Sequence, residues 1–121
     1  AGDEAYQATK ASLISFLDAT SQGKDMARLI MEKDVIPVVN SKASARLFFD
    51  MMTLFLKDAS SLSKGGTISL KAHESTIQDL VKSLPNIDKN LLALMTLRGE
   101  IETNIQIGLL LSHLAISIFK E

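Results

Sequence analysis

Apolar residues recur along this chain three and four positions apart, the spacing that places side chains on one face of an α-helix. No segment keeps the alternation typical of a half-buried strand. The first predicted helix begins at Asp3–Glu4 and ends at Ser21-Gln22-Gly23. Its apolar face consists of Tyr6, Leu13, Phe16 and Leu17. A short second helix, with Asp25 as candidate cap, carries Met26, Leu29 and Ile30, and Pro37 breaks or kinks any continuation of it.

The third predicted helix has the broadest apolar face. Asn40 or Ser41 is its candidate N-cap, and Gly65-Gly66 is expected to end it in a polar loop. Its apolar side consists of Leu47, Phe48, Met51, Met52, Leu54 and Phe55, and its polar side of Arg46, Asp50, Thr53 and Lys57. Because Arg46 and Asp50 are four positions apart, they are expected to be able to form an ion pair along the helix.

Three more helices complete the pattern. The fourth carries Ile77, Leu80, Val81 and Leu84 and ends at Pro85; the fifth, capped by Asn86, carries Ile87, Leu91, Leu94, Met95 and Ile101. The last helix runs from Ile105 to Phe119. The pattern therefore predicts one all-α domain over residues 1–121, a compact bundle of five or six helices with short connections.

The last helix is unusually apolar. Its 15 residues, interrupted by polar side chains, fall short of the roughly 20 that span a bilayer, so we expect no membrane insertion. At 100° per residue, Gln106, His113 and Ser117 form one polar stripe within an arc of about 40°. Two interpretations remain open: the helix is central in its own bundle, or it packs on the bundle on one side and on a partner chain on another.

Composition narrows the class of protein. The 121 residues suffice for one domain with a buried core, and hydrophobic residues make up 46%. The net charge of −1 comes from interspersed charges, which argues against a nucleic-acid-binding face. The absence of cysteine fits a reducing compartment. The polar start is not that of a signal peptide, and the opening Ala-Gly is typical of a fragment of a longer protein.

Candidate chemistry is sparse. His73 and His113 are forty positions apart and lack the spacing of a metal site, so they are expected to be polar edge or surface residues. Ser60, Ser61 and Ser63 precede the Gly pair and are interpreted as solvated turn formers. Glu100 and Glu102, two positions apart, diverge on a helix, and the Gly pair lacks the remainder of a phosphate-binding loop. We therefore expect no catalytic, cofactor or metal site, and no small-molecule substrate.

Several segments resemble a known family. The stretch Thr103–Leu114, with Asn104 leading into a Leu-rich helix, resembles the end of the C-terminal helical collar domain of bacterial DNA polymerase III clamp-loader subunits. The delta-prime subunit is the most similar, and gamma/tau is second. Ala45–Met52 resembles the family's helix before a polar loop, Thr67–Leu70 the short return, and Ile77–Ile101 the following helix pair. The resemblance covers roughly Ala43 to Phe119.

The resemblance implies a non-catalytic oligomerisation module in the cytoplasm. Such a domain packs with other clamp-loader subunits, delta and gamma/tau, in a five-membered collar that supports ATP-driven loading of the sliding clamp. It contacts no nucleic acid directly. On the last helix, Gln106, His113 and Ser117, with Leu110 beside them, would bind the neighbouring subunit. The alternatives are an unrelated helical interaction or adaptor domain and, third, a small helical enzyme or ligand carrier with an apolar cavity.

Overall fold

The computed structural model describes residues 2–103 and 105–120, which form six α-helices and no β-strand. The helices are α1 (Gly2–Thr20), α2 (Lys24–Ile30), α3 (Lys42–Ser63), α4 (Glu74–Ser83), α5 (Ile87–Glu100) and α6 (Ile107–Ser117). A π-helical turn, η1 (Met31–Val35), continues α2, and a 3₁₀ turn, η2 (Lys71–His73), precedes α4. The predicted all-α bundle of five or six helices is confirmed.

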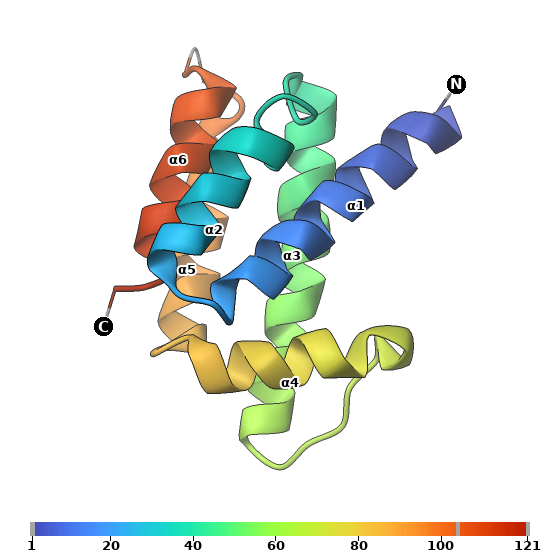
Figure 1. Cartoon of the computed structure of the whole chain (residues 1–121), viewed down its shortest axis with the longest axis vertical. Coiled ribbons are helices and arrows are strands. Elements are labelled where there is room, and N and C mark those ends of the chain that lie inside the picture. Colours follow the sequence, from blue (N-terminus) through green and yellow to red (C-terminus); the bar gives the residue numbers. More distant parts are fainter. Residues whose placement is uncertain (1, 104, 121) are drawn as a thin grey trace.

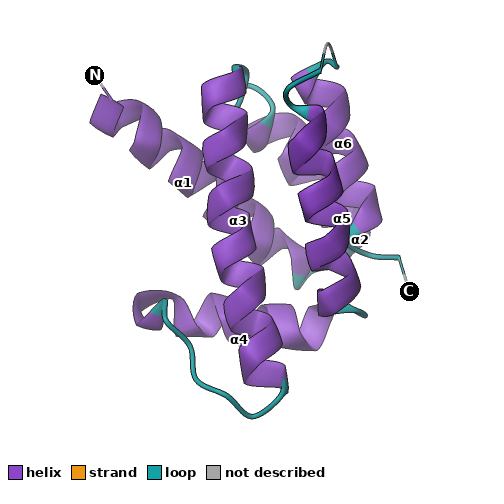
Figure 2. Ribbon diagram, turned by 180° about the vertical axis from the view of Figure 1, so that it is seen from behind, coloured by secondary structure: helices purple, strands orange, loops and turns teal. Residues whose placement is uncertain are grey.

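The long helix α3 organises the bundle, because it packs against α1, α4 and α5. In Figure 1, α1 and α2 lie in front of α3 and α5, while α4 crosses one end of the bundle. Seen from behind, α3 and α5 run side by side (Figure 2). The last helix, α6, contacts α2, η1 and α5, so it lies at one side of the bundle.

The core joins these helices through large apolar side chains. The Phe16 ring on α1 lies 6.5 Å, centroid to centroid, from the Phe48 ring on α3. Phe48 in turn meets Phe49 edge to face at 6.1 Å. The largest fully buried side chains are Phe16, Phe48, Phe49, Leu13, Leu17, Met31, Met52, Leu56, Ile77, Leu80, Leu94 and Ile101. Burial of this set is the dominant favourable contribution to folding.

Four residues predicted on buried faces are instead exposed. These are Tyr6, Leu29, Leu54 and Met95. Tyr6 lies in the first turns of α1, which extend beyond the rest of the bundle (Figure 1). The other three lie at the edges of apolar faces that are wider than the area covered by neighbouring helices.

Local capping rules locate most helix ends. Ser41 caps α3: its side chain accepts from the Ser44 amide, and the Ser44 hydroxyl accepts from the Ser41 amide, each at 3.1 Å. The Asn86 side chain caps α5 by accepting from the Lys89 amide at 3.1 Å. The predicted cap at Asp25 is wrong, because α2 begins at Lys24 and Gly23 occupies the N-cap position, two residues before Asp25.

The loop after α3 is tied back to that helix by a buried carboxylate. Asp58 accepts hydrogen bonds from the backbone amides of Ser69 and Leu70, the shortest at 2.7 Å. Gly65 has φ +83°, the left-handed conformation predicted for the helix end. A Cβ on Gly66 would lie 2.4 Å from the Ser61 hydroxyl oxygen, so the close approach of the loop requires glycine there.

The interpretation of Ser60 and Ser61 as solvated turn formers is wrong. Both lie within the last turns of α3 and make specific hydrogen bonds. The buried Ser60 hydroxyl donates to the Asp88 carboxylate at 2.6 Å, and the Ser61 hydroxyl donates to the Thr67 carbonyl at 2.8 Å. They fasten α3 to α5 and to its own loop, contacts that only the tertiary structure supplies.

Candidate interaction surface

The predicted polar stripe on α6 reaches solvent in part. Gln106 and His113 are exposed and Ser117 is half-buried. The Ser117 hydroxyl donates to the His113 carbonyl at 2.8 Å, so it is satisfied within the helix. Since α6 has an exposed side, it is not a central helix, and the first of the two interpretations of its apolar sequence is wrong.

The prediction that Leu110 lies at this surface is also wrong. Its side chain is fully buried against the core. The neighbouring Leu109 is exposed instead, at 54%, and Ile116 is exposed at 44%. The exposed face is therefore turned by roughly 40° from the predicted stripe, less than half of the 100° step between residues. Sequence reasoning missed Leu109 and Ile116, although their spacing around His113 follows i, i+4, i+7.

These residues define a mixed face, which we call the α6 surface: Gln106, Leu109, His113 and Ile116. Two apolar side chains alternate on it with two polar ones. An exposed face that combines apolar and polar side chains in this way is compatible with a protein contact site.

Grooves flank the α6 surface on both sides. Between α6 and α2–η1, a groove of about 300 Å³ is lined by Asp25, Arg28, Leu29, Met31, Glu32, Ser112, Ala115 and Ile116. Between α6 and α5, a second one is lined by Leu97, His113, Ile116, Ser117 and Lys120. Ile116 lines both grooves, and so forms the ridge between them. The first is at the lower limit of small-molecule sites and opens to solvent, a shape that suits side chains of a partner better than an enclosed ligand.

The π-helical turn forms one wall of the first groove. The Ile36 amide donates to the Met31 carbonyl, five residues back, at 2.9 Å. Such a turn inserts one residue into a helix and is often found at functional sites. Here Met31 and Val35 are buried, while the Glu32 carboxylate accepts from the α6 hydroxyl of Ser112 at 3.3 Å.

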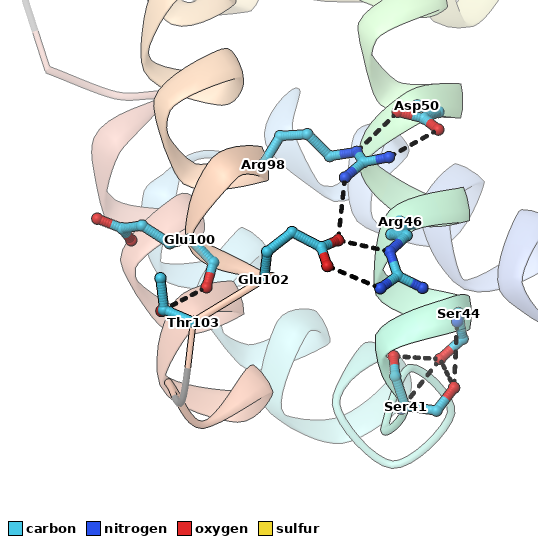
Figure 3. Close-up of polar contacts among 8 residues, drawn as sticks. All are labelled: Ser41, Ser44, Arg46, Asp50, Arg98, Glu100, Glu102 and Thr103. Atoms are coloured by element: carbon cyan, nitrogen blue, oxygen red, sulfur yellow. Dashed lines mark hydrogen bonds and ion pairs between the residues drawn. The ribbon is translucent and has the colours of Figure 1, made fainter.

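A second polar feature lies between α3 and the end of α5. The Arg46 guanidinium donates to both Glu102 carboxylate oxygens, at 2.6 and 2.9 Å. Arg98 donates to Asp50 at 3.0 Å and also lies 3.8 Å from Glu102. Figure 3 shows the four side chains converging between the two helices. The expected Arg46–Asp50 pair within α3 is therefore wrong, because each of these residues pairs with a partner brought by α5.

This network, Arg46, Asp50, Arg98 and Glu102, shifts two pKa values. The hydrogen bonds from Arg46 hold the pKa of Glu102 below its ordinary value, and Glu102 in turn raises the pKa of Arg46. Nearer the start of α5, hydrogen bonds from Ser60 and then Lys64 lower the pKa of Asp88. All three groups are exposed, so their interactions stabilise the packing of α3 on α5 only modestly and do not prepare a reactive group.

The two histidines lie far from any ligand set. The His73 ring, at the start of α4, lies 5.3 Å from the Phe55 ring. His113 is on the α6 surface. Among the residues that the structure describes, no three His, Cys, Asp or Glu side chains are grouped in a way that could hold a metal ion. Likewise, no helix over 2–103 and 105–120 combines the length and the apolarity needed to cross a bilayer.

The fold and this surface define a small all-α domain that exposes, among the described residues, a mixed apolar and polar face on α6. In comparisons with protein-family models, curated proteins and solved structures, none matches the chain.

Proposed function

We propose that this chain is a non-catalytic oligomerisation domain of the bacterial DNA polymerase III clamp loader, most similar to that of the delta-prime subunit. In this role it would pack beside delta and gamma/tau in the cytoplasmic collar. The observation that carries the proposal is the α6 surface, on which Leu109 and Ile116 remain exposed beside His113. Covering such side chains by a neighbouring subunit is favourable at about 25 cal/mol per Å² of apolar surface.

The order of elements supports the collar assignment. Ala45–Met52 lies in α3, Thr67–Leu70 lies in the loop before η2, and Ile77–Ile101 covers most of α4 and all of α5. This sequence of helix, polar loop, short return and helix pair is the layout that the resemblance implies. Within the last motif, Asn104 lies outside the described residues, and the following residues lead into α6.

The test is co-elution of the chain with purified delta and gamma/tau subunits. His113→Glu should weaken this assembly by about 2 kcal/mol or more, because a desolvated carboxylate without a partner would be placed in the contact. Its thermal melt should be nearly unchanged, since His113 is exposed. Ser15→Glu, at another exposed position, on α1, is the matched control and should affect neither assembly nor stability.

If the chain does not co-elute with these subunits, the collar assignment is wrong. An unrelated helical adaptor would then be the better interpretation of the α6 surface. If co-elution occurs but His113→Glu leaves it unchanged, the collar contact is on another face.

A further inference from the structure

A cavity lies at the end of the bundle where segments that are distant in the sequence meet. Its volume is about 570 Å³, within the range of small-molecule sites, and it opens to solvent. In Figure 1 the turn between α1 and α2 lies close to the end of α4 and to the segment after α6. We call this space the α1–α4 cavity. Its lining includes Ser21, Lys24, Asp79, Lys82, Ser83 and Phe119.

Two lysines from different helices line the cavity. Lys24 is the first residue of α2 and Lys82 lies in the last turn of α4, and both are exposed. Within the described residues, neither ammonium group has an ion-pair or hydrogen-bond partner, although Asp79 also lines the cavity. A cation suits the dipole at the end of α4 but not at the start of α2, so Lys24 gains nothing from its own helix. Two ammonium groups at one cavity attract an anion with more than one unit of charge.

The other polar side chains of the cavity act as hydrogen-bond acceptors. The Ser21 hydroxyl donates to the Asp18 carbonyl at 2.8 Å. The Ser83 hydroxyl donates to the Asp79 carbonyl at 2.6 Å, so the hydrogens of both serines are already used locally. An ionised carboxylate such as that of Asp79 has no hydrogen to donate. Oxygen lone pairs therefore remain for hydroxyl groups of a ligand, and the half-buried Phe119 ring supplies an apolar wall.

From this arrangement we propose that the α1–α4 cavity binds a small phosphate monoester with a hydroxyl-bearing body, such as a sugar phosphate. The phosphate group, which carries about −1.5 to −2 charges at pH 7, accepts from Lys24 and Lys82. Hydroxyl groups of the body donate to Asp79 and the serine oxygens, and its carbon face packs on Phe119. The proposal does not depend on the collar assignment, because Ile116 and the rest of the α6 surface lie outside this cavity.

Amide NMR shifts of the full chain test the proposal, with glucose 6-phosphate, ribose 5-phosphate and glycerol 3-phosphate as probes up to about 10 mM. At least one probe should give saturable shifts at Gly23, Lys24 and Ser83. Lys24→Gln and Lys82→Gln should each raise the dissociation constant of that probe roughly tenfold or more, because each removes a charge-assisted hydrogen bond. Lys33→Gln, at an exposed position of η1 outside the cavity, is the matched control and should leave it unchanged.

A comparison with inorganic phosphate separates recognition of the anion from recognition of the body. The wild type should bind the preferred sugar phosphate roughly tenfold more tightly than inorganic phosphate, since only the former has hydroxyl groups for Asp79. Asp79→Ala should reduce this ratio, because it removes the acceptor and leaves both lysines in place.

The proposal is wrong if no probe gives saturable shifts at the cavity, or if Lys33→Gln weakens binding as much as Lys24→Gln does. Inorganic phosphate that binds as tightly as every sugar phosphate would show that the lysines attract any anion, and would overturn the assignment of a hydroxyl-bearing ligand. An unchanged ratio in Asp79→Ala would equally contradict the role of Asp79 in holding the body.

Discussion

The Asp58 carboxylate accepts hydrogen bonds from the backbone amides of Ser69 and Leu70, and it is buried. In Asp58→Ala both amides lose their partner, which should cost about 1–3 kcal/mol of unfolding free energy in a denaturant titration. Hydrogen exchange at the two amides should accelerate. Lys57→Ala, the exposed neighbour on α3, is the control and should change neither quantity. Unaltered protection in Asp58→Ala would mean that the loop is held by other contacts.

At the residue scale, the sequence correctly predicted the roles of residues that depend only on their near neighbours along the chain. Ser41, Asn86 and Gly65 were predictable because caps and left-handed turns are local properties. The partner of Arg46 was not predictable from the sequence, because Asp50 is available only four residues away on the same helix. Glu102 becomes adjacent to Arg46 only when α5 packs on α3. Ser60 was misinterpreted for the same reason: its partner, Asp88, belongs to another helix.

At the scale of the element, the ion pairs between α3 and α5 predict a dependence of stability on pH. The folded-state pKa of Glu102 is lowered by Arg46, and that of Asp88 by Ser60 and Lys64. A lowered folded pKa gives stability that is fully present above the unfolded value, about 4.3 for Glu and 3.9 for Asp, and is lost as pH falls through the folded value. The raised pKa of Arg46 contributes stability that is lost only at strongly alkaline pH.

Denaturant titrations from pH 7 to pH 3 should therefore show a decline in unfolding free energy that begins near pH 5. Glu102→Gln should make this decline shallower, because one of the carboxylates with a lowered pKa has been removed. Glu4→Gln, on the exposed start of α1 and outside the network, should leave the slope unchanged. Equal slopes for Glu102→Gln and the wild type would show that the network contributes nothing measurable.

Helix faces were predicted less well than helix ends. The pattern on α6 correctly placed Gln106 and His113 in solvent but exchanged the roles of Leu109 and Leu110. When a helix is apolar almost all round, periodicity cannot fix which leucine faces the core, because neighbours α2, η1 and α5 decide it. The exposure of Leu54 and Met95 has the same cause, because the apolar stripe in the sequence does not indicate how much of it the neighbouring helices cover.

On the scale of the whole molecule, the bundle leaves two apolar regions on different sides. The α6 surface lies beside α2, while Leu54, Leu92 and Met95 are exposed on α3 and α5, which lie on the face seen in Figure 2. Among the described residues, every buried side-chain nitrogen or oxygen has a hydrogen-bond partner. The polar groups of the interior are therefore satisfied, and the apolar side chains that remain uncovered lie on the outside. Two such surfaces on one rigid bundle can act independently.

This separation gives the last prediction. If the collar contact is confined to the α6 surface, Met95→Glu should leave co-elution with delta and gamma/tau unchanged, whereas His113→Glu should weaken it. Because the two residues lie on different faces of the bundle, their effects on co-elution should combine additively, within about 0.5 kcal/mol, in the double variant. Co-elution measurements on the four proteins form a complete cycle. If Met95→Glu also impairs co-elution, the contact extends beyond the α6 surface.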